Sequence, residues 1–389
     1  MFKWKKTVLF LLCVCLVWGS LPLTANAENA ILTPPTLSAK SAVLIEAQNG
    51  CVVYGRNEGL RLPMASTTKI MTALVALELA TPNTQISVDA LAVGVEGSSI
   101  YLTEGETLTL EQLLYALLLE SANDAAVAIA IGLSGSVEAF ASSMNEKASA
   151  LGLTATHFEN PHGLDGEEHY TTAYELAVIA QALLENELLR TIVSTRKTTI
   201  PHAGTDGMRL LVNHNKLLRL YDGCIGVKTG FTKKSGRCLV SAAERDGVTL
   251  IAVTLDAPDD WNDHSALFDY GFTRFESVTL CKESELLYTM PLTGGIEEAV
   301  TLCNSEALRL TLPVGHGKIT HTVEADRFAY APISAGEILG KAVFYCDTDG
   351  DGIKERLGEV VLVSCNAVER YAPKKGFWAW FCGLFRRGA

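Results

Sequence analysis

The order in which strand-like and helix-like patterns of apolar residues follow one another along the chain is the feature that most constrains its fold. Residues 41–53 alternate around an Asn49-Gly50 pair, a strong turn signal, and predict a β-hairpin. Residues 238–255 predict a second hairpin with an Arg-Asp-Gly turn. Between the two hairpins, apolar residues recur at the spacing of an α-helix. We therefore expect an α/β (α+β) domain in which the N-terminal hairpin joins the late strands in one antiparallel sheet.

Four segments between the hairpins carry helical patterns. The first begins at Ser66, where Ile70, Leu74 and Leu77 follow at spacings of four and three and share one face. The other predicted helices cover residues 110–131, 136–151 and 172–185. After the second hairpin, residues 267–272 (Leu-Phe-Asp-Tyr-Gly-Phe) close the domain.

The sequence changes in character after this domain. Short runs of Val, Leu and Thr, split by Gly, Pro and Asp, predict a small β-sandwich or barrel-like domain with no helix longer than two turns. The predicted organisation is therefore a first domain at 38–275 and a β-rich domain at 276–368. Two segments of a different kind, 1–27 and 369–389, flank them.

The N-terminal segment has the three parts of a secretory signal peptide. Basic residues at 3, 5 and 6 precede an apolar stretch at 8–17, and Ala25-Asn26-Ala27 is a small-x-small cleavage site. A transmembrane helix needs about 20 apolar residues. Here Gly19, Ser20 and Pro22 interrupt the run too early. We expect export, followed by cleavage after Ala27.

The C-terminal segment, 369–389, combines basic and aromatic residues. It holds five basic residues and one acidic residue around the aromatic-rich stretch 377–385. This composition predicts an amphipathic segment that lies in the lipid headgroup region, with its rings at the interface. The alternative is a tail that packs on the sheet or on a partner.

The net charge argues against a nucleic-acid partner, and the spacing of the cysteines argues against a zinc site. The chain of 389 residues carries 32 Lys+Arg against 44 Asp+Glu, so its net charge of -12 argues against a nucleic-acid partner. Eight cysteines follow the signal segment, scattered singly, without the paired spacing of a zinc site. Export permits disulfides, but a chain of this size does not need them, and we expect most of these thiols to be free and buried.

Three short motifs occur in order and each stands on a suitable element. They are residues 66–69 (Ser-Thr-Thr-Lys) at a helix start, 121–123 (Ser-Ala-Asn) before a helical run, and 228–230 (Lys-Thr-Gly) on a strand. Singly each has a plain explanation, because a Ser-x-x-Lys tetrad arises by chance about once in such a chain and a serine at a helix start is usually an N-cap. Their joint occurrence indicates nucleophilic catalysis.

The chemistry needs these residue types at this spacing. Ser66 and Lys69, at i and i+3, share one helix face, so the amine reaches the hydroxyl. A serine needs an adjacent base, and Lys69 is a base only when neutral, which requires desolvation or a second positive charge such as that of Lys228. Ser121 is placed to pass a proton to the leaving amine, and Asn123 to hold Lys69 and the substrate amide.

These motifs resemble the active-site motifs of the penicillin-binding serine D-alanyl-D-alanine carboxypeptidases, peptidase family S11. Segments 158–165, 213–218 and 268–272 resemble the same family. The resemblance implies a transpeptidase/β-lactamase-like domain, a small all-β domain and a C-terminal anchor. It covers nearly the whole chain and implies no cofactor and no metal.

The resemblance also implies a reaction and its site. Ser66 forms an acyl-enzyme on a peptidoglycan pentapeptide stem, the terminal D-alanine leaves, and water completes the hydrolysis. Penicillins acylate the same serine. The resemblance places the oxyanion hole at the backbone N–H groups of Ser66 and Phe231, just beyond Gly230. From its chemistry, the Thr229 hydroxyl is suited to bind a free terminal carboxylate. His214 departs from the family, some members of which carry arginine there.

Three other functions remain as alternatives. A β-lactamase has the same motifs, but it needs a deacylating base that residues 159–162 do not supply. A zinc peptidase would use the clustered His157, His162, Asp165 and His169, which lack matched metal partners. A catalytically weak, membrane-attached wall-binding or penicillin-sensing protein is the third alternative.

A further motif, at residues 347–352, resembles the first half of a calcium-binding loop. The match fails at position twelve, where Gly358 stands in place of a bidentate glutamate. A β-hairpin with a Gly-Asp-Gly turn fits this segment better.

Overall fold

The computed structural model describes residues 33–202, 206–347 and 352–372. The predicted signal peptide at 1–27 and all but the first residues of the predicted anchor at 369–389 lie outside the described residues.

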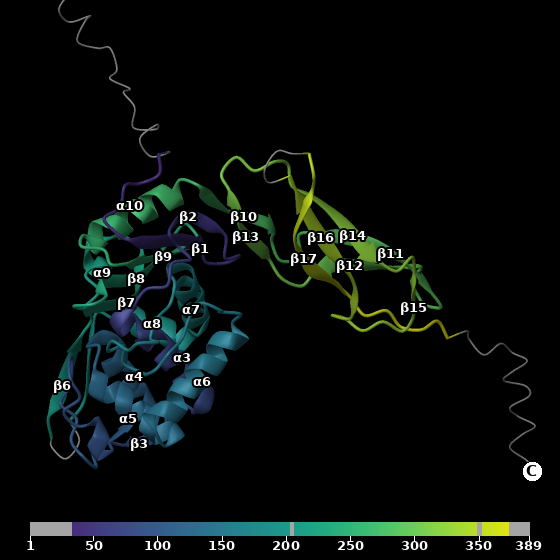
Figure 1. Cartoon of the computed structure of the whole chain (residues 1–389). Helices are drawn as coiled ribbons and strands as arrows, with labels where there is room; N and C mark the ends of the chain where they lie inside the picture. The colour runs from purple at the N-terminus through teal and green to yellow at the C-terminus, as the bar shows by residue number, and fades with distance from the viewer. Residues whose placement is uncertain (1–32, 203–205, 348–351, 373–389) are drawn as a thin grey trace, which may run out of the picture.

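One antiparallel sheet of five strands forms the centre of the first domain (Figure 1). Its order is β2-β1-β9-β8-β7, so the N-terminal hairpin does join the late strands, as predicted. The Asp246-Gly247 turn has positive φ at both residues, 51° and 82°, which suits the twist of a two-residue hairpin. The strands are β1 (Ser41–Glu46), β2 (Val52–Arg56), β7 (Cys224–Thr232), β8 (Gly236–Arg245) and β9 (Val248–Leu255).

Both faces of this sheet are buried, and β1 shows how. Val43 and Ile45 pack into the larger core with the helices α3 to α8, whereas Ala42 and Leu44 pack into a second core with α10. Successive residues of a strand point to opposite faces, so one strand supplies both cores. The helices are α3 (Lys69–Leu79), α4 (Leu110–Leu119), α5 (Asn123–Ser134), α6 (Val137–Ala150), α7 (Ala173–Glu185), α8 (Glu187–Ser194), α9 (Leu217–Leu220) and α10 (Asp260–Phe272).

The prediction of one helix over 110–131 is wrong. The chain forms α4 and α5 with a break between them, where Ser121 adopts a left-handed conformation (φ 62°). The predicted helices at 136–151 and 172–185 are confirmed as α6 and α7. At the predicted start at Ser66, a short 3-10 helix, η1 (Ala65–Thr68), leads into α3.

Residues 275–364 form two sheets, and no helix occurs among the described residues of this part. The β16–β17 pairing confirms the predicted hairpin, although residues 348–351 of its connection lie outside the described residues. The two-stranded sheet joins β10 (Phe275–Cys281) and β13 (Leu308–Pro313). The six-stranded sheet contains β11 (Leu287–Thr293), β12 (Ala299–Asn304), β14 (Thr320–Ala325), β15 (Ala329–Tyr330), β16 (Ile338–Cys346) and β17 (Glu355–Ser364).

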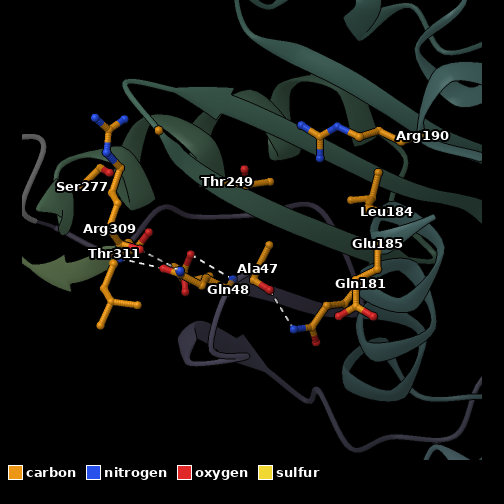
Figure 2. A pocket seen from close by; sticks show the side chains of 13 residues that line it. Ala47, Gln48, Gln181, Leu184, Glu185, Arg190, Thr249, Ser277, Arg309 and Thr311 are labelled. Carbon is orange, nitrogen blue, oxygen red and sulfur yellow. Dashed lines mark hydrogen bonds between the residues drawn. The ribbon is translucent and has the colours of Figure 1, made fainter. Parts of the chain in front are cut away.

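The β-rich part meets the first domain at the β1–β2 turn. The Gln48 side chain donates from Nε2 to the Arg309 carbonyl (3.2 Å) and accepts from the Thr311 N–H (2.8 Å). Figure 2 shows these bonds beside a cavity of about 320 Å³ that both parts line. In Figure 1 the β10–β13 sheet lies next to the first domain and β15 lies at the far end.

Two antiparallel sheets of two strands each flank the helices of the first domain. They pair β3 (Gln85–Ser87) with β4 (Thr107–Thr109), and β5 (Lys197–Pro201) with β6 (Met208–Val212). Within the part of the chain that the structure describes, no single helix is long and apolar enough to cross a membrane; by length and composition alone, only the bent pair α5 and α6 passes that test.

The seven described cysteines carry free thiols, as expected for most of them. The expectation that most are buried is wrong, because four of the seven are half-buried or exposed. Those four are Cys51, Cys224, Cys303 and Cys365, and the buried three are Cys238, Cys281 and Cys346. Cys382 lies outside the described residues.

Candidate active site

The structure places Ser66 and Lys69 in direct contact. Ser66 lies in η1, immediately before α3, and Lys69 is the first residue of α3. The Lys69 Nζ lies 3.0 Å from the Ser66 Oγ. The Lys69 side chain is fully buried, whereas Ser66 is half-buried and lines a cleft. The Ser66 side chain is therefore accessible from the cleft, and the Lys69 side chain is not.

The surroundings of Lys69 favour a neutral amine. Burial, and then the charge of Lys228, hold the Lys69 pKa well below its usual value, while Asp124 opposes them. The amine also contacts the Asn123 Oδ1 (2.7 Å) and the His162 carbonyl oxygen. A neutral amine has two hydrogens and one lone pair. The two oxygens accept its hydrogens, which leaves the lone pair for the Ser66 hydroxyl.

Lys228 is the second buried cation of the site. It lies on β7, and its Nζ donates to the Thr229 carbonyl oxygen (2.9 Å). Burial lowers the Lys228 pKa to about 7, against the attraction of Glu120. A lysine that titrates near neutral pH beside a candidate base is typical of a catalytic site.

Replacing Lys228 by methionine is expected to stabilise the folded protein. The Lys228 pKa is about 7 in the folded protein and 10.5 for an ordinary lysine, so between these values the folded state binds fewer protons than the unfolded state. Native stability therefore rises with pH across this window, and the buried charge costs on the order of 2–4 kcal/mol at pH 7. We expect Lys228→Met to melt roughly 5–10 °C above the native protein at pH 7.

Thermal melts between pH 7 and pH 10 check this prediction. The difference in melting temperature between Lys228→Met and the native protein should shrink as the pH rises. At high pH, Lys228 loses its proton in the unfolded state as well as in the folded state. Lys233→Met, which changes an exposed lysine in the β7–β8 turn, should show no such trend. A Lys228→Met variant that melts at or below the native temperature at pH 7 would contradict the prediction.

The helix break places Ser121 at the cleft and Asn123 directly behind it. Ser121 lines the cleft with Ser66, and Asn123 begins α5 with its Nδ2 donating to the Glu96 carbonyl. This bond fixes the amide orientation, so the Oδ1 faces Lys69. The neighbouring Asp124 carboxylate accepts from the Ile100 N–H (3.2 Å) and the Leu102 N–H (3.0 Å). The loop that covers the break is thereby tied to α5.

A loop from Phe158 to His169 supports the nucleophile from the other side. Its Pro161 carbonyl accepts from the Thr72 hydroxyl (2.6 Å), one turn along α3. Gly163 has φ 91°, and a Cβ there would stand 2.0 Å from the Ala65 carbonyl oxygen. Only glycine fits this close approach. The loop and the backbone of the nucleophile are therefore packed as one unit.

The histidines of this loop have structural partners. The His169 Nδ1 accepts from the Glu159 N–H (3.1 Å), which leaves Nε2 to donate to the Thr68 hydroxyl (2.8 Å). Burial lowers the pKa of His169 to about 4 and that of His162 to about 3. Over the described residues, no group of three or more His, Cys, Asp or Glu side chains is arranged to hold a metal ion.

The cleft has a volume of about 370 Å³ and brings the three motifs together. Of the predicted residues, Ser66, Ser121, Thr229, Gly230 and Phe231 line it, while Lys69, Asn123 and Lys228 lie buried behind it. The remaining lining residues, which the motifs do not include, are Ser98, His214, Lys216, Arg237, Asp260 and Trp261. Among these, His214 and Lys216 lie in the family-like segment 213–218, and the other four carried no signal in the sequence.

Residues 28–259 match the family model described as D-alanyl-D-alanine carboxypeptidase. The chain is 34% identical over 349 residues to the D-alanyl-D-alanine carboxypeptidase DacF of Bacillus subtilis, and the match covers 87% of each protein. Among solved structures, penicillin binding protein 5 from Haemophilus influenzae superposes with a TM-score of 0.64 at 26% identity, covering 87% of this chain and 99% of that one.

A shorter relative matches a smaller share of the chain. The D-alanyl-D-alanine carboxypeptidase of Streptomyces sp. strain K15 is 35% identical over 273 residues, which is 65% of this chain and 92% of that protein. The longer relatives extend the similarity into the β-rich part.

Proposed function

The chain belongs to the D-alanyl-D-alanine carboxypeptidases of peptidase family S11, and we propose that it removes the terminal D-alanine from peptidoglycan pentapeptides through an acyl-enzyme on Ser66. The observation that carries this proposal is the buried Lys69 amine, which lies 3.0 Å from the Ser66 hydroxyl and also contacts the Asn123 Oδ1 and the His162 carbonyl oxygen. The fold is the transpeptidase/β-lactamase-like α/β fold, followed by an all-β part, as in the relatives.

In the first step, the Ser66 hydroxyl proton passes to the Lys69 Nζ as the Oγ attacks the carbonyl carbon of the penultimate D-alanine. The backbone N–H groups of Ser66 and Phe231 hold the developing oxyanion. In support, Gly230 packs so closely that an added Cβ would stand 3.1 Å from the Ser66 nitrogen. The end of β7 therefore lies against the backbone of the nucleophile.

In the second step, the C–N bond breaks and the proton that Lys69 took from Ser66 passes through Ser121, which lines the same cleft, to the leaving amine. D-Alanine departs, and Ser66 carries the acyl group as an ester. Water then attacks the ester carbon as Lys69 accepts a proton from that water. The bond between the acyl carbon and the Ser66 Oγ breaks, Lys69 returns the proton to the Oγ, and the shortened peptide leaves as its carboxylic acid. Asn123 holds Lys69 in place throughout through its Oδ1.

Two measurements test the function. The native chain should release D-alanine from diacetyl-Lys-D-Ala-D-Ala, and a labelled penicillin should appear, after digestion, on the peptide that contains Ser66. Labelling without release of D-alanine would favour the penicillin-sensing alternative. Label on a different peptide would refute Ser66 as the nucleophile.

We also propose the division into a catalytic domain at 38–275 and a β-rich domain at 276–368. In support, the apolar clusters of the first part and of the β-rich part are separate, and the Streptomyces relative covers 65% of this chain with 92% of its own length. From the sequence we further propose export through residues 1–27 and membrane attachment through 369–389. Fractionation of cells that express the full chain, or a chain ending at residue 368, tests the attachment; equal release of both into the soluble fraction would refute it.

A further inference from the structure

The proposed substrate ends in a free carboxylate, and the cleft offers three basic side chains that could meet it. These are His214, Lys216 and Arg237. The His214 ring faces the Glu120 carboxylate (3.2 Å), so that group already has an acidic partner. Lys216 is an exposed lysine next to the short helix α9. Arg237 differs from both because its side chain is held in one orientation.

Arg237 stands beside the Lys-Thr-Gly strand. It lies near the start of β8, and its register partner on β7 is Phe231, the residue that follows Gly230. Cross-strand partners are neighbours on a sheet surface. Arg237 and Ser66 line the same cavity of about 370 Å³. One molecule bound in this cavity could therefore contact both Arg237 and Ser66.

Two residues at the start of α10 position the guanidinium. Its Nη2 donates to the Asp260 Oδ1 (2.9 Å), and its central carbon lies 5.6 Å from the centre of the Trp261 ring. Asp260 is 3% exposed in its side chain, whereas Arg237 is 42% exposed. The bond to Asp260 uses one of five N–H donors. An anchored guanidinium that stays open to the cleft is suited to bidentate binding of a carboxylate.

We propose that Arg237 binds the terminal carboxylate of the D-Ala-D-Ala substrate and determines the preference of the enzyme for a free C-terminus, with Asp260 and Trp261 as its positioning residues. This inference rests on the proposed function. Thr229, which lines the same cleft, adds only a neutral hydroxyl. A substrate whose terminal carboxylate is amidated or bonded to another residue loses the contact with Arg237.

The test compares diacetyl-Lys-D-Ala-D-Ala with its C-terminal amide, measuring kcat/KM for the acid and the amide in each variant. The native enzyme should prefer the acid. Arg237→Gln should reduce kcat/KM for the acid by about 10- to 100-fold and leave the amide nearly unchanged, so the acid-to-amide ratio collapses. Arg237→Lys should give an intermediate ratio, because the charge remains and the planar fork is lost. The ratio is independent of the folded fraction of each variant.

Two lysine variants complete the test. Lys233→Gln removes an exposed cation from the neighbouring turn and should leave the ratio as in the native enzyme. Lys216→Gln removes the competing cation of the cleft; a collapse of the ratio there, or an unchanged ratio in Arg237→Gln, overturns the assignment to Arg237. If the native chain releases no D-alanine from the acid, the proposed function fails instead.

Discussion

Ser66→Ala should lose D-alanine release from diacetyl-Lys-D-Ala-D-Ala, with kcat/KM lower by about 10⁴-fold or more. The Oγ is the atom that forms the acyl-enzyme, and no other hydroxyl contacts the Lys69 amine among the bonds of the described residues. The variant should also fail to retain a fluorescent penicillin on a denaturing gel. Because Ser66 is half-buried at the cleft and its side chain is small, the fold should survive the change.

The control for this variant is Ser143→Ala. Ser143 lies on α6, and its hydroxyl donates to the Ala139 carbonyl (3.4 Å) within that helix. The activity and melting temperature of Ser143→Ala should match those of the native enzyme. Release of D-alanine by Ser66→Ala at the native rate would refute the proposed mechanism.

Lys69→Arg should be nearly as inactive in acylation as Ser66→Ala, with a loss of about 10²- to 10⁴-fold. The guanidinium keeps a positive charge and hydrogen-bond donors, yet it does not lose its proton in a protein, so it cannot act as a base. The rate of penicillin acylation, followed by stopped-flow fluorescence, measures this step. An active Lys69→Arg variant would show that the residue acts through its charge alone.

The pH dependence of acylation gives a second measure of the same residue. The Lys69 pKa is held well below its usual value, and the amine is a base only when neutral. Acylation by the native enzyme should therefore fall as the pH is lowered through the Lys69 pKa and reach a plateau above it. Raising the pH should not rescue Lys69→Arg, because the guanidinium stays protonated.

The sequence predicted the sheet well because its signals are local. Turn residues such as Gly50 and Gly247, with φ 71° and 82°, sit where two-residue or short turns need them. The helix break at Ser121 escaped prediction because its neighbours, Leu, Glu, Ala and Asn, are all compatible with a helix. The break depends on contacts such as those of Asp124 with the distant loop 98–102, which are a product of the folded chain.

In the candidate site too, local signals were predictable and contacts that form only in the folded chain were not. Side chains in motifs were predictable, whereas main-chain groups were not. The His162 carbonyl oxygen accepts from Lys69, and because every residue has a carbonyl oxygen, the residue type does not reveal this contact. Arg237 and Trp261 escaped prediction because they lie on separate elements, β8 and α10, and meet only in the fold. Gly163, in the family-like segment 158–165, packs closely against the Ala65 carbonyl oxygen and so helps to shape the site.

The contact of Gln48 with β13 has a consequence for the chemical ageing of the protein. Its amide bonds only main-chain groups, those of Arg309 and Thr311, so side chains on β13 can vary without loss of these bonds. Deamidation of Gln48 would replace the donor with a carboxylate oxygen facing the Arg309 carbonyl. Two hydrogen-bond acceptors, the new carboxylate and the Arg309 carbonyl oxygen, would then face each other. This would weaken the contact between the β-rich part and the first domain.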